Sequence, residues 1–362
     1  MVGIVSADPT SRRLDGVQIL RGAAATAVAW HHALETSKGI GYAVSPPDWL
    51  VLSGAAGVDV FFVVSGFIMV YICARRGDVG GAGASARFLT NRARRIFPLY
   101  WCCCALFLFA MALGFFQEKT LNPSDVAASL ALWPTDLRII GISWTLSYEM
   151  YFYLIFAVSL LAQDLRGAVL GAGGAMVAIT VLSNLAFDAE SFIASPIVLE
   201  FVMGMAAAMA YLHGRRRWKL PGPAVLTGVA IAAIVGASIV FFAGTTHSLP
   251  GHVRFLVWGI PSVLLLAAAL QMRGETSSAR RLGVAIGDAS YAIYLFHPLV
   301  LIVYAKAFET LPALSLMSQW VWVPVVTIGC IGVGCAVHRA IERPLAKMLS
   351  RSRVARLAVA ST

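Results

Sequence analysis

The chain has 362 residues, of which 59% are hydrophobic and only 13% are charged. Soluble domains carry about 25% charged residues, so this composition excludes a soluble enzyme, a disordered protein, a collagen and a disulfide scaffold. It predicts a polytopic membrane protein. The net charge of +10 is assigned to basic cytoplasmic loops rather than to nucleic-acid binding. The six cysteines have no histidines at zinc-ligand spacing and are interpreted as small apolar residues.

Apolar stretches long enough to cross a bilayer recur along the whole chain. A spanning helix needs about 20 such residues, and the qualifying stretches are 15–33, 50–73, 96–114, 143–163, 167–187, 192–212, 222–243, 254–272, 284–305 and 318–338. The first contains Arg21 and no cleavage site follows it, so it is a span and not a signal peptide. The sequence predicts an all-α integral membrane protein, a single bundle of about ten transmembrane helices.

The loop charges alternate between the two sides of this bundle. Of the 28 Lys and Arg, 22 fall on the side of the N-terminus, and the other side holds Lys38, Lys119, Arg138, Arg254 and Lys306. Because Lys and Arg accumulate in cytoplasmic loops, both termini are predicted to be cytoplasmic. The chain is then divided into a cytoplasmic N-terminal segment (1–13), a transmembrane domain (14–345) and a basic cytoplasmic tail (346–362).

Ionisable residues inside the spans are candidates for function, because burying them in a membrane is costly unless they are paired or face a wet cavity. They are Arg21, His32, Asp59, Glu149, Glu200, Asp288 and His297. Arg21 and His32 are eleven residues apart, which places them on one helix face about 16 Å apart. His31 points about 80° away from that face. The alternative is a structural histidine pair at a helix end.

The direction of each span indicates how deep these groups lie. Asp59 and Glu149 are expected about 9–14 Å below the outer face, and His297 at middle to outer depth. Two imidazoles and two carboxylates are therefore expected to meet in the outer half of the bundle. A histidine with a carboxylate on its second nitrogen is a usual general base. Ion pairs that only stabilise helix packing are the competing interpretation.

Two further features have both a functional and a structural interpretation. Arg92 and Arg95 share a helical face, and arginine forks bind phosphates; the same segment would also serve as an ordinary basic flank of a span. Ser65 has no neighbouring triad motif, so a small-residue helix contact is favoured over a nucleophile.

Taken together, the motifs resemble those of the acyltransferase 3 family of integral membrane O-acyltransferases. Arg21 followed by His32 is similar to the family's Arg/Lys-x10-His signature, and Arg92 and Arg95 match its Arg-x-x-Arg segment. The remaining matches surround Asp59 and Ser65, then Trp144, Tyr148 and Glu149, then Tyr291 and His297, and finally 341–344. The resemblance covers about 14–345 and is greatest to the exopolysaccharide-modifying, ExoZ-type branch.

This resemblance implies transfer of an acetyl group from acetyl-CoA to a hydroxyl of a glycan or undecaprenyl-linked sugar, in the bacterial inner membrane. His32 would be the catalytic histidine with Arg21 as its motif partner, and Arg92 and Arg95 would bind the donor's phosphates. We expect Asp59 or Glu149 to orient the His32 ring, and no metal. Ser65, Trp144, Tyr148, Tyr291 and His297 are further candidate site residues. Membrane lipids and polysaccharide-synthesis machinery are the expected partners.

Two other classes of protein are compatible with a bundle that carries charges near its middle. A transporter or flippase of a polar or lipid-linked substrate would use the same kind of cavity, but the sequence has no inverted repeat and no matched pair of broken helices. A structural assembly subunit would give no reason for an outer cluster of histidines and carboxylates.

Overall fold

A computed structural model describes residues 14–40, 46–77, 79–115, 120–186, 191–214, 220–241, 251–272, 277–311 and 317–349. The predicted N-terminal segment 1–13 and residues 350–362 of the predicted tail lie outside the described residues. The division into 1–13, 14–345 and 346–362, and the cytoplasmic placement of both termini, therefore stay predictions.

The described residues form helices joined by short connections, and no strand occurs among them. The first half contains α1 (Asp15–Gly39), α2 (Asp48–Ser53), η1 (Gly54–Ala56), α3 (Gly57–Arg76), α4 (Ala82–Ala112), α5 (Pro123–Leu130), η2 (Gly141–Ser143), α6 (Trp144–Ser159) and α7 (Leu165–Ala186). The second half contains η3 (Phe192–Ala194), η4 (Pro196–Val198), α8 (Leu199–Gly214), α9 (Pro223–Phe241), α10 (Gly251–Arg254), the π-helical turn η5 (Phe255–Gly259), α11 (Ile260–Gln271), α12 (Ser278–Asp288), α13 (Ser290–Thr310), α15 (Gln319–Val337) and the π-helical turn η6 (His338–Glu342).

Every predicted span overlaps helix, and among the described residues eight helices are long and apolar enough to cross a membrane. The two remaining predicted spans correspond to α1 and α6. Polar side chains such as Arg21 and His32 make α1 less apolar, and α6 has only 16 residues. The count of ten spans stays a prediction.

Two of the predicted spans differ from the structure in ways that affect the site. The stretch 284–305 is not one helix, because α12 ends at Asp288 and α13 begins at Ser290. The helix expected at 96 begins at Ala82, so Arg92 and Arg95 lie inside α4 and not in a loop before it.

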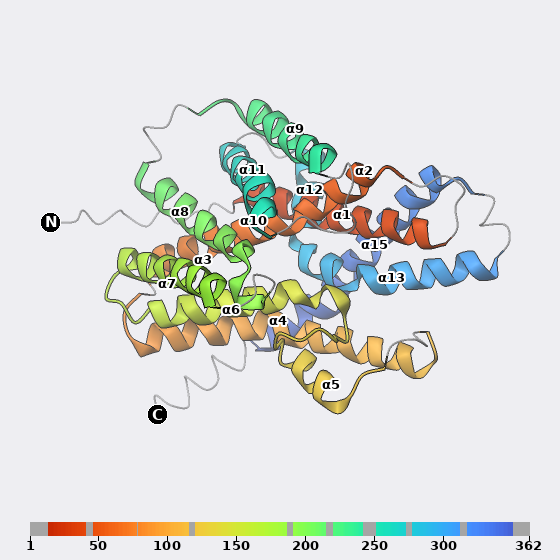
Figure 1. The fold of residues 1–362 in the computed structure, drawn as a ribbon, viewed down its shortest axis with the longest axis horizontal. Helices are drawn as coiled ribbons and strands as arrows, with labels where there is room; N and C mark the ends of the chain where they lie inside the picture. Colours follow the sequence, from red (N-terminus) through yellow and green to blue (C-terminus); the bar gives the residue numbers. More distant parts are fainter. Residues whose placement is uncertain are drawn as a thin grey trace.

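The helix α1 lies at the centre of the molecule. It contacts α3, α11, α12, α13 and α15. In Figure 1, α9 and α11 lie on one side of α1 and α3, and α4, α6 and α7 lie on the other. The polar face of α1 is therefore enclosed by helices, which is the arrangement that its ionisable residues need in a membrane.

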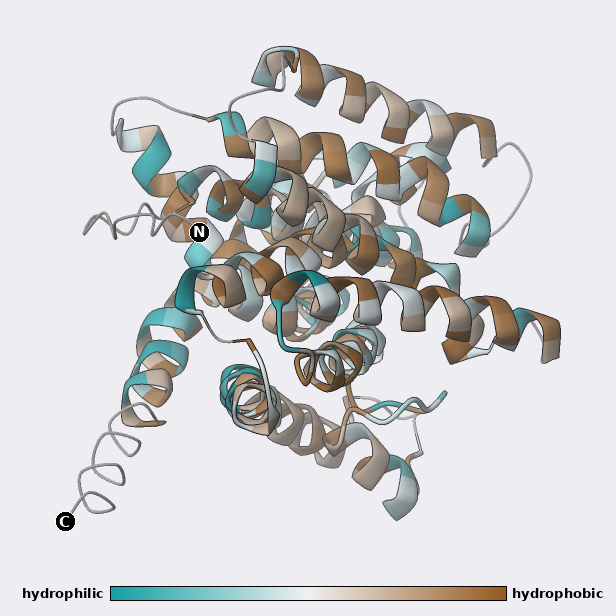
Figure 2. Ribbon diagram, turned by 90° about the vertical axis from the view of Figure 1, so that its left-hand side faces the viewer, coloured by the Kyte–Doolittle hydropathy of each residue, from teal (hydrophilic) through white to brown (hydrophobic). Residues whose placement is uncertain are grey.

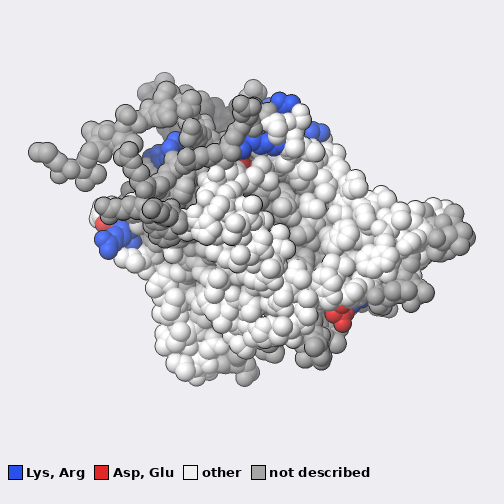
Figure 3. Space-filling view, turned by 90° about the horizontal axis from the view of Figure 1, so that it is seen from above, with Lys and Arg blue, Asp and Glu red and all other residues white. Residues whose placement is uncertain are grey.

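The outer faces of the helices are apolar. Figure 2 shows hydrophobic residues along the outer helices, and the face seen in Figure 3 carries its few charged side chains near the edges. Large apolar side chains such as Leu185, Val240 and Ile328 are exposed. The surface of a soluble protein does not carry so many exposed large apolar side chains. A lipid environment accounts for this surface, and the chain is a multi-pass membrane protein.

A glycine contact joins α3 to α8. A Cβ atom on Gly204 would overlap the carbonyl oxygen of Val63, and one on Gly66 would overlap the carbonyl oxygen of Phe201. Small residues at a helix interface let two backbones approach closely. The small-residue contact predicted at Ser65–Gly66 is thus made by Gly66, and Ser65 has a different environment.

Candidate active site

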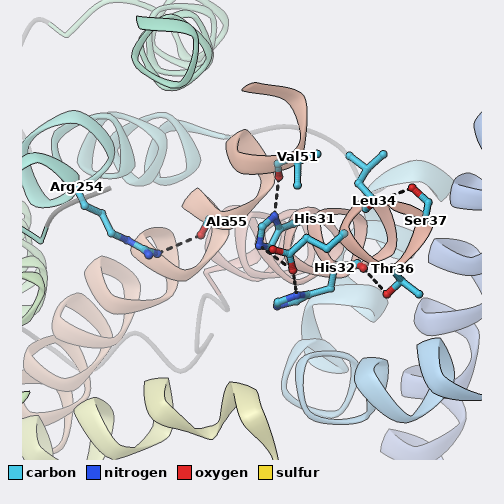
Figure 4. Close-up of polar contacts among 9 residues, drawn as sticks. His31, His32, Leu34, Thr36, Ser37, Val51, Ala55 and Arg254 are labelled. Atoms are coloured by element: carbon cyan, nitrogen blue, oxygen red, sulfur yellow. Dashed lines mark hydrogen bonds and ion pairs between the residues drawn. The ribbon is translucent and has the colours of Figure 1, made fainter. Parts of the chain in front are cut away.

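The histidine pair of α1 has a fixed hydrogen-bond arrangement. Nδ1 of His32 lies 2.7 Å from Oε2 of Glu35, and Nδ1 of His31 lies 2.6 Å from the carbonyl oxygen of Val51. Figure 4 shows both contacts and the different directions of the two rings. An ionised carboxylate can only accept a hydrogen bond, so Nδ1 of His32 is the donor in this contact, and in the neutral ring Nε2 carries the lone pair. This is the tautomer that a general base requires.

A third imidazole lies against His32. The rings of His32 and His297 are stacked with centroids 5.2 Å apart and an angle of 19° between their planes. His297 is fully buried, and its Nδ1 lies 2.7 Å from the carbonyl oxygen of Tyr294. The prediction that two imidazoles of α1 and α13 meet is confirmed.

The two carboxylates expected beside His32 have other partners. Asp59 binds Arg254, and Glu149 accepts hydrogen bonds from Ser65 at 3.0 Å and from Tyr153. The expectation that Asp59 or Glu149 orients the His32 ring was wrong, because Glu35 makes that contact. Glu35 lies three residues after His32 and two residues beyond the predicted end of the first span, where a search for ionisable groups inside spans does not reach.

Three cavities follow one another along the bundle. The histidine cavity, of about 300 Å³, is lined by Val28, His31, His32, Leu52, Ala55, Val58, Ile142, Trp144, Arg254, Trp258 and Tyr294. The central cavity, of about 90 Å³, is lined by several polar residues, among them Arg21, Ser65, Arg92, Arg95, Glu149, Tyr153 and Tyr291. The arginine cavity, of about 510 Å³, is lined among others by Gln18, Arg21, Arg94, Arg95, His338, Glu342 and Arg343.

The three cavities share residues with their neighbours. Arg21 and Arg95 line both the arginine cavity and the central cavity. Val58 and Tyr294 line both the central cavity and the histidine cavity. The cavities are therefore neighbours in series, with the arginines at one end and His32 at the other.

The predicted site residues divide among these cavities. The central cavity brings together Arg21, Ser65, Arg92, Arg95, Glu149 and Tyr291, whereas the histidine cavity holds His32 and Trp144. Tyr148 lines none of the three and stacks on Phe192 at 4.1 Å. Arg92 and Arg95 both line the central cavity, and Arg95 also reaches the arginine cavity, where Arg94 and Arg343 are its neighbours.

The burial and the partner of Arg254 were not predicted from the sequence, which assigned this residue to an outer loop. The structure buries it in α10, where Nε and Nη2 donate to Oδ1 and Oδ2 of Asp59 at 3.0 and 2.8 Å. Glu200 is also fully buried beside this pair. The unfavourable position of Asp59 inside a span signals that a cation must lie nearby, but spacing alone does not identify it.

A metal ligand set is also present on α1. His31, His32 and Glu35 each offer one ligand atom, and these atoms lie within 4.8 Å of one another. Such a set suits zinc or a similar ion, but Glu35 already accepts from His32. The expected absence of a metal stays a prediction.

The histidines of α1 therefore lie at one end of a series of cavities that several polar residues line. The chain belongs to the acyltransferase 3 family, described as an acyltransferase domain, which matches residues 14–339. It is an acyltransferase, as the sequence motifs predicted.

Three relatives align over most of their length. The exopolysaccharide production protein ExoZ of Rhizobium meliloti (strain 1021) is 33% identical over 320 residues, which cover 84% of this chain and 92% of ExoZ. The acyltransferase MdmB of Streptomyces mycarofaciens is 26% identical, with 83% of each chain covered. Nodulation protein 10 of Rhizobium leguminosarum bv. viciae is 24% identical, covering 86% of this chain and 87% of the relative. No solved structure matches the chain.

Proposed function

We propose that the protein transfers an acetyl group from acetyl-CoA to a hydroxyl of a polysaccharide or undecaprenyl-linked sugar, with His32 as the general base. The observation that carries this proposal is the Glu35–His32 pair, because it holds Nε2 of His32 as a proton acceptor inside a cavity. Membership of the acyltransferase 3 family supplies the reaction class. The name of ExoZ supports an exopolysaccharide as the acceptor.

The series of cavities supports CoA as the donor. CoA carries several negative charges, and the arginine cavity offers Arg94, Arg95 and Arg343, whose forks suit phosphate groups. The pantetheine arm would extend through the central cavity, past Arg21 and Arg92, and bring the thioester to His32. In this proposal the arginine cavity faces the cytoplasmic side of a bacterial inner membrane, where acyl-CoA is found.

The chemistry then needs one proton acceptor and one proton donor. Nε2 of His32 takes the proton of the acceptor hydroxyl as its oxygen attacks the thioester carbonyl carbon. The C–S bond breaks, and the proton moves from His32 to the leaving sulfur, which gives the ester and free CoA. Glu35 stabilises the imidazolium that forms between these two events.

The first experiment compares surface polysaccharide by mass spectrometry from a host carrying the wild-type gene, a deletion, His32→Ala or His213→Ala. We expect the acetyl mass shift to vanish in the deletion and to fall about 100-fold or more with His32→Ala, as loss of a general base predicts. His213 is exposed at the end of α8 and serves as the matched control, with normal acetylation expected.

Two outcomes would contradict the proposal. Wild-type acetylation in a folded His32→Ala protein would exclude the base, and failure of polymer export in the deletion with acetylation unchanged in His32→Ala would favour the transporter. Treatment of purified protein with EDTA is expected to leave acetyl transfer unchanged. A loss that zinc restores would assign His31, His32 and Glu35 to a metal instead.

A further inference from the structure

Arg254 is the only lysine or arginine among the residues that line the histidine cavity. Its guanidinium is fixed by Asp59, which accepts from both Nε and Nη2, and Nη2 also lies 3.4 Å from the carbonyl oxygen of Ala55. Nη1 takes no part in the salt bridge with Asp59. Figure 4 shows the side chain of Arg254 extending toward the carbonyl oxygen of Ala55.

Two indole rings restrict the guanidinium further. Its central carbon lies 5.1 Å from the ring centroid of Trp258 and 5.8 Å from that of Trp144, distances at which a cation is attracted to an aromatic face. The π-helical turn η5 begins directly after Arg254, and such turns occur at functional sites more often than elsewhere. The cation is therefore held in place before any substrate arrives.

A helix-packing role alone does not account for this arrangement. A buried ion pair contributes little net stability compared with apolar residues of the same size, and Arg254 of this pair lines the cavity that contains His31 and His32. Because Asp59 accepts from Nε and Nη2 and balances the charge, Arg254 acts here as a directed hydrogen-bond donor rather than as a free positive charge. It is a preorganised donor in the cavity that also contains His31 and His32.

Acyl transfer requires such a donor. When the acceptor oxygen bonds to the thioester carbon, the carbonyl electron pair moves to the carbonyl oxygen, and that oxygen becomes negatively charged until the C–S bond breaks. Fixed donors aimed at this developing charge are commonly the largest single contribution to catalysis of acyl transfer. His32 takes the acceptor proton and cannot also stabilise the oxygen.

We propose that Arg254 stabilises the oxyanion of the acyl-transfer transition state and that Asp59 is its positioning residue. This inference rests on the proposed function. It gives Asp59 a role through Arg254, in place of the contact with His32 that the sequence suggested. Asp59 comes from α3 and Arg254 from α10, 195 residues later, so the pair also sets the position of α10 against the centre of the bundle.

The test uses the purified full-length protein in nanodiscs, with acetyl-CoA as donor and methanol as acceptor, and measures methyl acetate and free CoA by mass spectrometry. Methanol needs a general base but has no ring or charge that Arg254 could recognise. We expect Arg254→Gln to lower kcat by about 100- to 1000-fold, the effect of removing one oxyanion donor, and to leave the KM for acetyl-CoA within about 3-fold.

A double variant tests whether Asp59 acts through Arg254 or independently of it. Asp59→Asn should lower kcat less than Arg254→Gln, and Asp59→Asn combined with Arg254→Gln should be no slower than Arg254→Gln alone, since Asp59 acts through Arg254. The double variant also removes both buried charges, so it keeps the test valid if Arg254→Gln by itself unfolds. Additive losses would mean that Asp59 acts independently and would overturn its assigned role.

The failure of this inference is distinguishable from the failure of the proposed function. Wild-type kcat with methanol in a folded Arg254→Gln protein that remains dependent on His32 would exclude the oxyanion role only. If polysaccharide acetylation were then lost while methanol acetylation persisted, Arg254 would be an acceptor-binding residue. Absence of any His32-dependent transfer in the wild type would instead overturn the proposed function.

Discussion

The contact between Glu35 and His32 determines what the histidine can do. The side chain of Glu35 is partly exposed, whereas that of His31 is mostly buried, and Oε2 of Glu35 lies 2.7 Å from Nδ1 of His32. His31 has its own Nδ1 against the carbonyl oxygen of Val51 and supports the connection between α1 and α2. Two adjacent histidines of identical chemistry thus receive different roles from their hydrogen-bond partners.

Replacing Glu35 with Gln should lower kcat about 10-fold, because an amide can orient the ring but does not stabilise the imidazolium. The KM for acetyl-CoA should not change. Steady-state kinetics of the purified protein measure both. Glu309→Gln is the matched control, since Glu309 is also an exposed glutamate paired with a neighbouring side chain, Lys306. Equal kcat values for the two variants would remove Glu35 from the mechanism.

At the scale of the elements, the glycine contact between α3 and α8 positions the residues of the central cavity. Ser65 lies next to Gly66, and its hydroxyl reaches Glu149 of α6. If α8 were pushed away from α3, the helix that carries both Ser65 and Asp59 would shift against α6 and α10. Close packing here therefore supports the geometry on both sides of α3.

Gly204→Val should destabilise the protein by about 3 kcal/mol, the upper range of overpacking, because its Cβ would overlap the backbone of Val63. Thermal unfolding in detergent is the measurement. Gly228→Val in α9 is the matched control, because nothing lies within 4 Å of a Cβ added there, and both changes place a β-branched residue in a helix. If the two variants unfolded at the same temperature, the close α3–α8 contact would not be limiting for stability.

The whole molecule is organised around the series of three cavities, which connects a basic end of the bundle to the histidines. Arg343 lines the arginine cavity and comes from the last described part of the chain, whereas Arg21 comes from the first helix. Both ends of the domain thus contribute to the same proposed donor site.

Arg343→Gln should raise the KM for acetyl-CoA about 10-fold, equivalent to the loss of one hydrogen bond to a charged group. The KM for acetyl-pantetheine, which has no phosphates, should stay unchanged. Arg166→Gln is the control, because Arg166 lies at an apolar groove between α7 and α8. An equal rise with both donors would show that Arg343 acts on the fold and not on the phosphates.

The sequence by itself determined the positions of the helices and the candidate site residues. Backbone groups in lipid must satisfy one another within a segment, so apolar length alone located nearly every helix, and the cost of buried charge selected Arg21, His32, Asp59 and His297. The eleven-residue spacing of Arg21 and His32 was also sufficient to place them on one face of α1, where each lines a cavity of the same series.

Only the tertiary structure decided which of these groups meet. Asp59 pairs with Arg254 from 195 residues away, and Glu149 with Ser65 from 84 residues away. Helix periodicity fixes how residues are arranged around one axis, but it leaves open the rotation of each helix and the order of helices around α1. Since those two quantities depend on packing between neighbours such as Gly66 and Phe201, the partners of the buried charges emerge only when the whole bundle is assembled.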